Sequence, residues 1–303
     1  MNRVASSGRA DNIPLAVGMI LLTVLALSLG DALVKLLSGD FVIWQLFVLR
    51  SLIAIPCLVF YLWLKDRSLL HLSGALSWAI LRSMLLVGMW VSYYISLPNL
   101  SLSVAAATYY TLPVFITLLS AVLVGDPVGR SGWLAVFIGF VGILFILRPN
   151  AGDFNSYALF PLLSAILYAF AMILTRTKCR EENPVVLSLM LNIAFVIVGS
   201  VAAIIISMVP DESRHGFLLA PWVAMGPSVW LSMCLLATAI LIGSVGAAIA
   251  YQNGPASMIG TFDFAYVGFA VLWGVMFFAD VPDAISVLGM ALIVCAGIIS
   301  LRQ

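Results

Sequence analysis

The sequence contains few charged residues. Only 9% of its 303 residues are Asp, Glu, Lys or Arg, whereas 63% are hydrophobic. A soluble domain carries roughly a quarter charged residues to cover its surface. This chain has too few for that, so a soluble globular protein is excluded, and the formal net charge of +1 gives no reason to expect nucleic-acid binding. The composition therefore places the chain in a lipid bilayer.

Several reactive groups are also scarce. Four cysteines are scattered without paired spacing, which excludes a disulfide framework or cysteine metal site. Only two histidines occur, His71 and His215, and both fall in predicted loops, so an intramembrane enzyme would lack clustered catalytic groups. No Gly-x-x-x-x-Gly-Lys-Ser/Thr phosphate loop is present. We expect no enzyme, no metal, no cofactor and no ATP-driven pump, and as partners only a small-molecule substrate and the bilayer.

Long apolar runs are abundant instead. A membrane-spanning helix needs about 20 mostly apolar residues. The sequence therefore predicts an all-α membrane protein with ten transmembrane helices, at residues 14–36, 41–64, 73–97, 101–124, 131–148, 156–175, 184–209, 221–251, 255–278 and 283–301.

Basic residues predict the orientation of these spans. The first 13 residues are polar and indicate a cytosolic tail rather than a cleavable signal peptide. With that start, the inner side holds nine basic residues, whereas the outer loops hold only Arg148 and Arg214. Excess Lys and Arg in cytoplasmic loops is the usual arrangement. We expect both termini in the cytosol. The nine inner residues are Arg3, Arg9, Lys65, Arg67, Arg130, Arg176, Lys178, Arg180 and Arg302.

A faint internal repeat is present. Residues 99–148 align with residues 253–302 without a gap, at a constant offset of 154. Dividing the chain near residue 150 gives five spans in each half. Because five is odd, the second half enters the membrane from the opposite side and has the opposite orientation. We expect two inverted five-helix repeats, residues 1–150 and 151–303, an architecture typical of secondary transporters with a site near the midplane. The identical pairs are Asn99/Asn253, Ser103/Ser257, Phe115/Phe269, Asp126/Asp280, Leu134/Leu288, Leu147/Leu301 and Arg148/Arg302.

The order of motifs across the spans resembles a known family. The first span ends in Ser28-Leu-Gly-Asp-Ala-Leu-Val-Lys35, the second carries Gln45-Leu-Phe-Val-Leu-Arg50, and the fourth and fifth meet at Gly125-Asp126. These features resemble EamA-type carriers of the drug/metabolite transporter superfamily, closest to the YddG type of bacterial inner-membrane amino-acid exporter. One departure is that Asp126 and Asp280 stand where the family often has Glu.

The resemblance carries implications for function. It implies a bacterial inner-membrane secondary transporter that exports small amphipathic metabolites, amino acids including aromatic ones, by alternating access. An exporter of drugs or other metabolites is the alternative within the family. A membrane channel or sensor is the alternative from a different class.

Five ionisable residues lie within predicted spans, where such groups normally face protein or water. Asp31 and Lys35 are four residues apart and are expected to form a local pair that fixes the end of the first span. Arg50 is expected to brace neighbouring helices through carbonyls or a carboxylate. Arg82 and Asp263 lie at similar depth on the third and ninth spans. They either bind or gate a zwitterionic substrate, or form a permanent structural ion pair.

Aromatic residues are the other candidate site groups. In the third span, Trp78, Arg82 and Met89 recur at helical spacing and predict a polar and aromatic stripe. An apolar cavity with a few polar groups suits amphipathic ligands. Some rings must face lipid, so not every aromatic residue lines the predicted cavity. The aromatic candidates are Trp90, Tyr93, Tyr94, Tyr109, Tyr110, Tyr168, Tyr251 and Tyr266.

Small residues and one proline predict how helices pack and bend. Gly243 and Gly246 in the eighth span are expected to allow close helix packing. Pro113, in the middle of the fourth span, is expected to kink its helix. The kink is either a hinge between transport states or a static bend.

Overall fold

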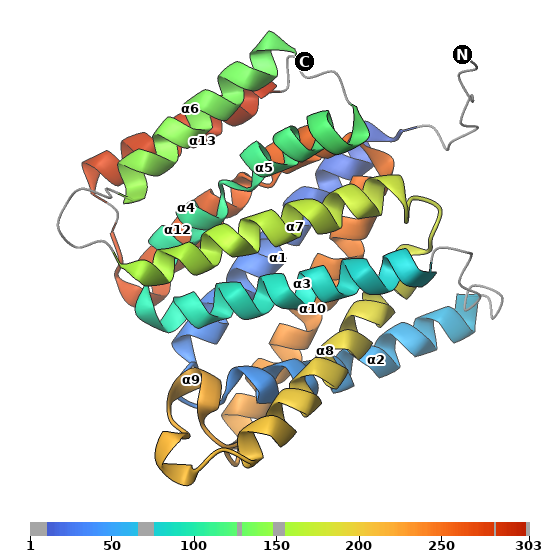
Figure 1. The fold of residues 1–303 in the computed structure, drawn as a ribbon, viewed down its shortest axis with the longest axis vertical. Helices are drawn as coiled ribbons and strands as arrows, with labels where there is room; N and C mark the ends of the chain where they lie inside the picture. Colours follow the sequence, from blue (N-terminus) through green and yellow to red (C-terminus); the bar gives the residue numbers. More distant parts are fainter. Residues whose placement is uncertain (1–10, 66–75, 126–128, 148–154, 282, 301–303) are drawn as a thin grey trace.

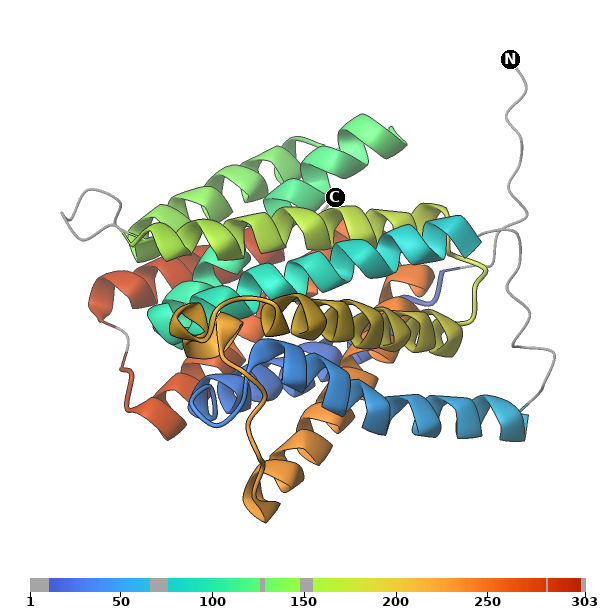
Figure 2. The same cartoon turned by 60° about the horizontal axis from the view of Figure 1, so that its bottom comes forward.

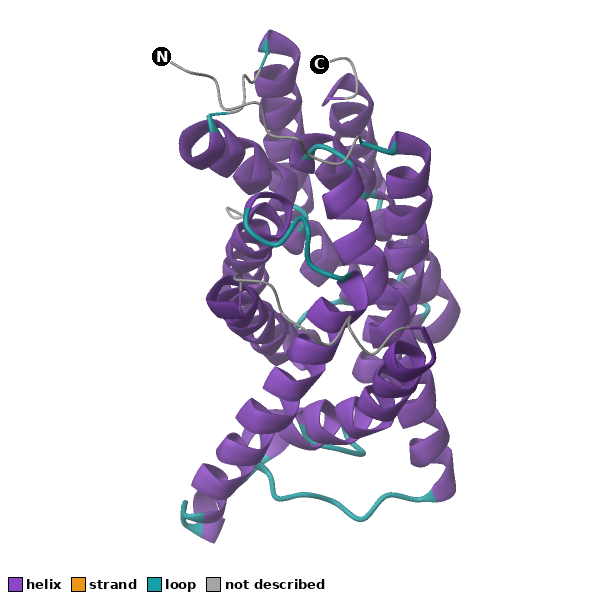
Figure 3. Ribbon diagram, turned by 90° about the vertical axis from the view of Figure 1, so that its right-hand side faces the viewer, coloured by secondary structure: helices purple, strands orange, loops and turns teal. Residues whose placement is uncertain are grey.

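The structure is a computed structural model that describes residues 11–65, 76–125, 129–147, 155–281 and 283–300. Every regular element in these ranges is a helix (Figures 1 and 3). The predicted all-α membrane fold is therefore confirmed.

The first half of the chain contributes six α-helices. They are α1 (Ile13–Leu36), α2 (Ile43–Lys65), α3 (Leu76–Ser96), α4 (Leu102–Tyr109), α5 (Leu112–Leu119) and α6 (Arg130–Leu147). The second half contributes seven. They are α7 (Leu159–Thr177), α8 (Pro184–Ser207), the short α9 (Gly216–Leu219), α10 (Pro227–Asn253), α11 (Ala256–Phe262), α12 (Ala265–Phe278) and α13 (Ala284–Ser300).

Each of the ten predicted apolar stretches coincides with helix, but not all are equally long. In the described residues, eight helical segments are long and apolar enough to cross a membrane. The other two stretches, within α6 and α13, contain shorter apolar helices at Arg130–Gly142 and Val287–Ala296. The structure therefore supports eight long spans, with α6 and α13 as shorter apolar helices.

The fourth and ninth predicted spans are interrupted. The first interruption lies at Tyr110 and Thr111 between α4 and α5, and the second at Asp263 and Phe264 between α11 and α12. Pro113 stands in the first turn of α5. A proline is tolerated there because the N–H it lacks has no helical partner. The span is thus interrupted directly before Pro113, close to the expected kink, and whether the interruption acts as a hinge or a static bend stays a prediction.

The two halves of the chain interleave. The four most extensive contacts each join one helix of the first half to one of the second: α6 with α13, α1 with α10, α3 with α7 and α2 with α8. In addition, α4 contacts α12 and α5 contacts α11. In both views α6 lies at one edge of the molecule and α2 at the opposite edge (Figures 1 and 2). The helices therefore share one core rather than forming two separate bundles.

The helix ends gather at two opposite ends of the bundle. At one, which we name the Asp11 end, the Asn12 N–H donates to the Asn253 carbonyl over 2.9 Å, so α1 begins where α10 ends. At the other, the Lys35 end, the Lys35 ammonium reaches the carbonyls of Leu97 and Leu100, beyond the end of α3. Helices run between these two ends (Figure 1).

Candidate functional site

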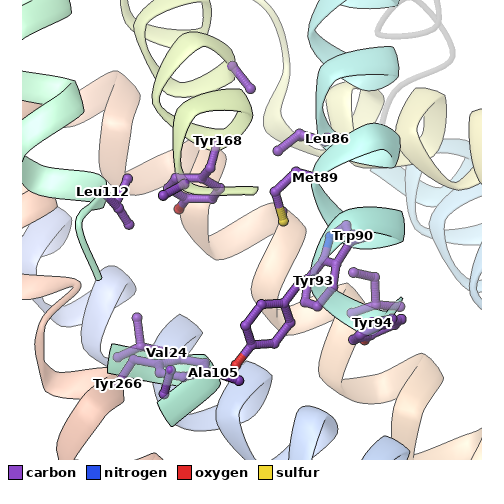
Figure 4. Packing of buried hydrophobic residues seen from close by; sticks show 14 of the residues in the cluster. Val24, Leu86, Met89, Trp90, Tyr93, Tyr94, Ala105, Leu112, Tyr168 and Tyr266 are labelled. Atoms are coloured by element: carbon purple, nitrogen blue, oxygen red, sulfur yellow. Dashed lines mark hydrogen bonds between the residues drawn. The ribbon is translucent and has the colours of Figure 1, made fainter. Parts of the chain in front are cut away.

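A cavity of about 50 Å³ lies between α1, α3, α7, α10 and the two interrupted spans. Figure 4 shows Met89 and Tyr93 extending from α3 toward the side of Tyr168 and Tyr266. The lining residues are Val24, Leu27, Asp31, Arg82, Leu86, Met89, Trp90, Tyr93, Tyr109, Tyr110, Tyr168, Met172, Leu191, Ile240, Gly243, Ser244, Ala247, Asp263 and Tyr266.

Asp263 lies at the interruption between α11 and α12. Asp263 is only 2% exposed, and the Tyr251 hydroxyl from α10 donates to its Oδ2 atom over 2.6 Å. The rings of Tyr251 and Tyr168 lie 6.2 Å apart, which brings α7 to the same cluster. The helix break thus presents a buried carboxylate that is held by a tyrosine from another element.

Asp31 lies near the end of α1 and forms a second acidic cluster. The Tyr266 hydroxyl from α12 donates to Asp31 Oδ2, and the Tyr93 hydroxyl of α3 lies 3.1 Å from that of Tyr266. Asp31 Oδ1 is buried and has no hydrogen-bond partner. Asp31 therefore belongs to the cavity wall, where it joins three elements.

The predicted pair between Asp31 and Lys35 is wrong. Lys35 Nζ donates to the Leu97 and Leu100 carbonyls over 2.9 and 2.6 Å. Carbonyl groups just beyond a helix C-terminus lack helical partners and attract cations. Lys35 therefore pairs with carbonyl groups of the α3–α4 connection, and Asp31 lines the cavity without it.

Arg82 is 1% exposed and lines the cavity. Its Nε donates to Thr175 Oγ1 of α7 over 2.6 Å, while its Nη1 atom is buried without a partner. Between the two described side chains of Arg82 and Asp263 there is no ion pair. The permanent structural ion pair is therefore wrong, while a role in binding or gating stays a prediction.

Arg50 lies away from the cavity and bridges α2, α3 and α8. Its Nη1 donates to the Tyr94 hydroxyl over 3.2 Å, and its guanidinium lies 4.7 Å from the centroid of the Phe195 ring and 5.5 Å from that of Trp90. Its partners are therefore aromatic rings and a hydroxyl rather than the expected carbonyls or carboxylate. Such cation–π contacts are favourable where water is excluded.

Five tyrosines line the space between the two carboxylates, and we name them the tyrosine sleeve: Tyr93, Tyr109, Tyr110, Tyr168 and Tyr266. Tyr109 is central, because its ring centroid lies 5.3 Å from that of Tyr93, 5.4 Å from Tyr110, 5.9 Å from Tyr168 and 6.4 Å from Tyr266. The sleeve therefore offers tilted and edge-on rings along the cavity.

Three predicted site residues, Trp78, Tyr94 and Tyr251, do not line the cavity, although Tyr251 holds Asp263. Trp78 is 40% exposed, and the Lys178 ammonium lies 5.3 Å from its ring centroid. Tyr94 is buried, but it lies on a different side of α3 from Tyr93 and contacts Arg50 (Figure 4). The predicted stripe from Trp78 fails because only the part of α3 from Arg82 onward faces the cavity.

Gly243 and Gly246 lie where α10 contacts α1. A Cβ atom on Gly243 would stand 2.3 Å from Leu27 Cδ2, and one on Gly246 would stand 2.2 Å from Thr23 Oγ1. Both distances are far below van der Waals contact, so only glycine fits this packing. Gly243 also lines the cavity, which ties the close helix approach to the site.

Sequence reasoning missed the cavity roles of Asp31 and Thr175. Asp31 shares a helical face with Val24 and Leu27, and all three line the cavity, so helical spacing was an available signal. Thr175 offers no such signal, because its role depends on α7 packing beside α3.

A polar cluster lies at the Asp11 end. Asp11 accepts hydrogen bonds from Arg176 Nη1 and Nη2 over 3.0 and 3.1 Å, and from Arg180 Nη2 over 2.5 Å. The hydrogen bond from Arg176 lowers the pKa of Asp11 below its ordinary value of 3.8. This cluster ties the start of α1 to the end of α7.

The long apolar helices define a multi-pass membrane protein. Residues 14–148 match the model of the EamA-like transporter family. Over 91% of this chain and 93% of its own length, the pseudopaline exporter CntI of Pseudomonas aeruginosa is 25% identical. The S-adenosylmethionine uptake transporter of Rickettsia bellii is 22% identical over 93% of this chain and 91% of its own length.

Two further similarities agree with this result. The riboflavin transporter of Rhizobium johnstonii is 28% identical over 66% of this chain and 61% of its own length. A solved crystal structure that covers 96% of both chains has a TM-score of 0.70 at 19% identity, which shows a shared fold. The EamA-like match covers residues 14–148, and together with the relatives it supports a membrane transporter of small molecules rather than an enzyme. None of the three named relatives is described as an amino-acid exporter, so that expectation stays a prediction.

Proposed function

We propose that this protein is a secondary transporter that exports small amphipathic metabolites, amino acids including aromatic ones, across the bacterial inner membrane by alternating access. The observation that carries this proposal is the cavity at the two helix interruptions. It combines carboxylates, a guanidinium and the tyrosine sleeve in a buried space. Transporter sites are typically formed by discontinuous helices near the bilayer midplane.

The packing supports two inverted repeats, residues 1–150 and 151–303. In such a repeat each span corresponds to the span five places along the chain, so α1 corresponds to α7 and α10 corresponds to α3. The contact between α1 and α10 therefore has a counterpart in the contact between α7 and α3. The pair α2 and α8 then maps onto itself, as do α6 and α13. The interruptions at Tyr110 and Phe264 also correspond at the offset of 154 residues.

Charge distribution supports an orientation for the molecule. Lys65 ends α2 at the Asp11 end, where Arg176, Lys178 and Arg180 also lie. Arg214 lies between α8 and α10, toward the Lys35 end. By the positive-inside rule the Asp11 end is cytosolic, which places both termini in the cytosol.

The site groups suggest how an amino acid binds. Arg82 Nη1 is free to donate to the carboxylate of the ligand, and Asp263 offers oxygen atoms to its ammonium group. An aromatic side chain would then lie among the rings of the sleeve. The cavity of about 50 Å³ is smaller than ordinary ligand pockets of roughly 300–1,000 Å³. Loading therefore requires the surrounding helices to separate, which is the movement that alternating access demands.

A second candidate cargo is a larger ring-bearing metabolite or drug. The tyrosine sleeve favours planar rings of any origin. The relatives include proteins named as transporters of riboflavin and of S-adenosylmethionine. A channel or sensor is the alternative of a different class, and it would show no counterflow.

Purified protein in liposomes tests the proposal. Preloading with an unlabelled amino acid should produce saturable counterflow of the labelled form. Asp263→Asn should reduce this counterflow at least tenfold, because it removes the charge offered to the ammonium group. Asp40→Asn, a change at an exposed residue outside the cavity, serves as the matched control and should retain the wild-type rate. Absence of counterflow across a broad amino-acid panel would contradict the proposed cargo, and counterflow of riboflavin instead would favour the second candidate.

A further inference from the structure

Asp31 Oδ1 is an acceptor without a donor inside the cavity. The atom is buried and unpartnered, and the residue is 2% exposed. Neither Lys35 nor Arg50 donates to Asp31: Lys35 donates to two carbonyls, and Arg50 donates to Tyr94 among aromatic rings. Leaving a buried carboxylate oxygen unpaired is costly. Within the described ranges the Tyr94 hydroxyl lies near Asp31, but no donor meets hydrogen-bond geometry at Oδ1.

Groups from three elements surround Asp31. Tyr266 of α12 already donates to Oδ2, and Tyr93 of α3 contacts the Tyr266 hydroxyl. Val24 and Leu27 of α1 are apolar and line the same space. The unpartnered oxygen therefore faces a cavity wall made of rings and aliphatic groups.

Asp31 and Asp263 mark different ends of the tyrosine sleeve. Tyr93 and Tyr266 belong to the Asp31 cluster, whereas Tyr168 and Tyr251 lie with Asp263. The ring of Tyr109 stands between them, 5.3 Å from Tyr93 and 5.9 Å from Tyr168 by centroid. A ligand whose head group lies at Arg82 and Asp263 would extend past Tyr109 to reach Asp31.

We propose that Asp31 binds the far end of the cargo and selects molecules whose ring carries a hydrogen-bond donor, above all a cationic amine, opposite the amino-acid head group. This inference rests on the proposed function, because it takes the head group to lie at Arg82 and Asp263. Asp31 acts as a specificity residue and the tyrosine sleeve holds the ring.

The chemistry around Asp31 favours a ligand group that donates a hydrogen bond over one that accepts. An ionised carboxylate can only accept hydrogen bonds, and Oδ2 is already satisfied by Tyr266. A cationic amine would also lie near the faces of Tyr93 and Tyr266, where cation–π attraction adds to the charge pairing. A ring that ends in a methyl group would leave Oδ1 unpaired.

Matched ligands measure this selectivity. Two unlabelled ligands, L-4-(aminomethyl)phenylalanine and L-4-methylphenylalanine, are compared as inhibitors of the counterflow of a labelled amino acid. They differ only at the far end of the ring. The wild type should bind the amine at least tenfold more tightly. Asp31→Asn retains the side-chain size but removes the charge, so this ratio should fall at least fivefold.

Asp263→Asn is the matched control variant. It should weaken both ligands to a similar extent and leave their ratio unchanged, because Asp263 is assigned to the head group. An unchanged ratio in Asp31→Asn would overturn the inference and leave the proposed function intact. A preference for L-4-carboxyphenylalanine over the amine would also overturn it, since it would require a donor at Asp31.

A failure of the variant to fold and a failure of the wild type to bind have different consequences. If Asp31→Asn cannot be purified as a folded protein, the wild-type ligand pair decides, and equal affinities overturn the inference. If the wild type binds none of the amino acids, the proposed cargo fails, and the inference falls with it.

Discussion

At the scale of single residues, Lys35 shows how a charged group supports a helix connection. Its ammonium donates to the carbonyls of Leu97 and Leu100, and both leucine residues are buried. Lys35→Met would leave these carbonyls unpaired, at a cost of about 1–3 kcal/mol. We expect a lower thermal unfolding temperature in detergent.

The control for this change is Lys35→Arg, which keeps a charged donor near the same carbonyls. It should lose less stability than Lys35→Met. An unfolding temperature for Lys35→Met equal to that of the wild type would show that the two hydrogen bonds add nothing to stability.

At the scale of helical elements, two corresponding connections use the left-handed backbone region. Gly125 has a φ of +78° and Ala279 a φ of +52°, and their numbers differ by the repeat offset of 154. A residue with a Cβ atom pays roughly 1–2 kcal/mol for this conformation. We expect Gly125→Ala to destabilise the protein and Ala279→Gly to stabilise it by about 0.5–1 kcal/mol, as measured by thermal unfolding in detergent.

Both positions are exposed, and a Cβ atom on Gly125 would meet nothing within 4 Å. Steric contacts therefore do not complicate this comparison. Gly18→Ala, within α1 and also in open space, is the control, and it should be neutral or slightly stabilising because alanine favours helix. Changes of the same sign at Gly125 and Ala279 would contradict the shared cap geometry.

At the scale of the whole molecule, the Asp11 cluster ties α1 to α7 at one end of the bundle. Alternating access requires the two ends to open in turn, so this tie should favour closure of the Asp11 end. Asp11→Asn should increase labelling of Ala247→Cys, in a cysteine-free background, by an impermeant maleimide added from that side. Ala247 lines the cavity on α10. Labelling that does not change would contradict a closing role.

The same cluster has a defined pH dependence. Because Arg176 lowers the pKa of Asp11 below 3.8, the carboxylate is ionised at neutral pH. Its stabilisation is fully present above the ordinary pKa and is lost as the pH falls through the lower folded value. We therefore expect maleimide labelling, normalised at each pH to the rate of a fully exposed cysteine because only the thiolate reacts, to stay constant from pH 8 to pH 5 and to rise only near or below pH 4. A rise between pH 8 and pH 5 would point to a different group.

The residues show where prediction from sequence succeeds and fails. Span count already predicts similar depths for Arg82 and Asp263. Eight of the aromatic and charged site candidates, such as Arg82, Tyr109 and Asp263, line the cavity together with Met89. Trp78 and Tyr94 do not, since sequence does not determine which part of a helix faces a neighbour. The pair of Asp31 and Lys35 failed because distant carbonyls on the α3–α4 connection compete for the lysine.

The sequence by itself determined that this protein lies in a bilayer and is helical, because apolar runs of about 20 residues satisfy their own backbone hydrogen bonds in lipid by forming helices. It also placed charged residues within the spans, where they are costly and must find partners. Only the tertiary structure decided which partners those are. Interleaving of the two halves brings Asp31 to Tyr266 and Arg82 to Thr175. The site therefore depends on contacts between residues far apart in the chain, which local spacing does not encode.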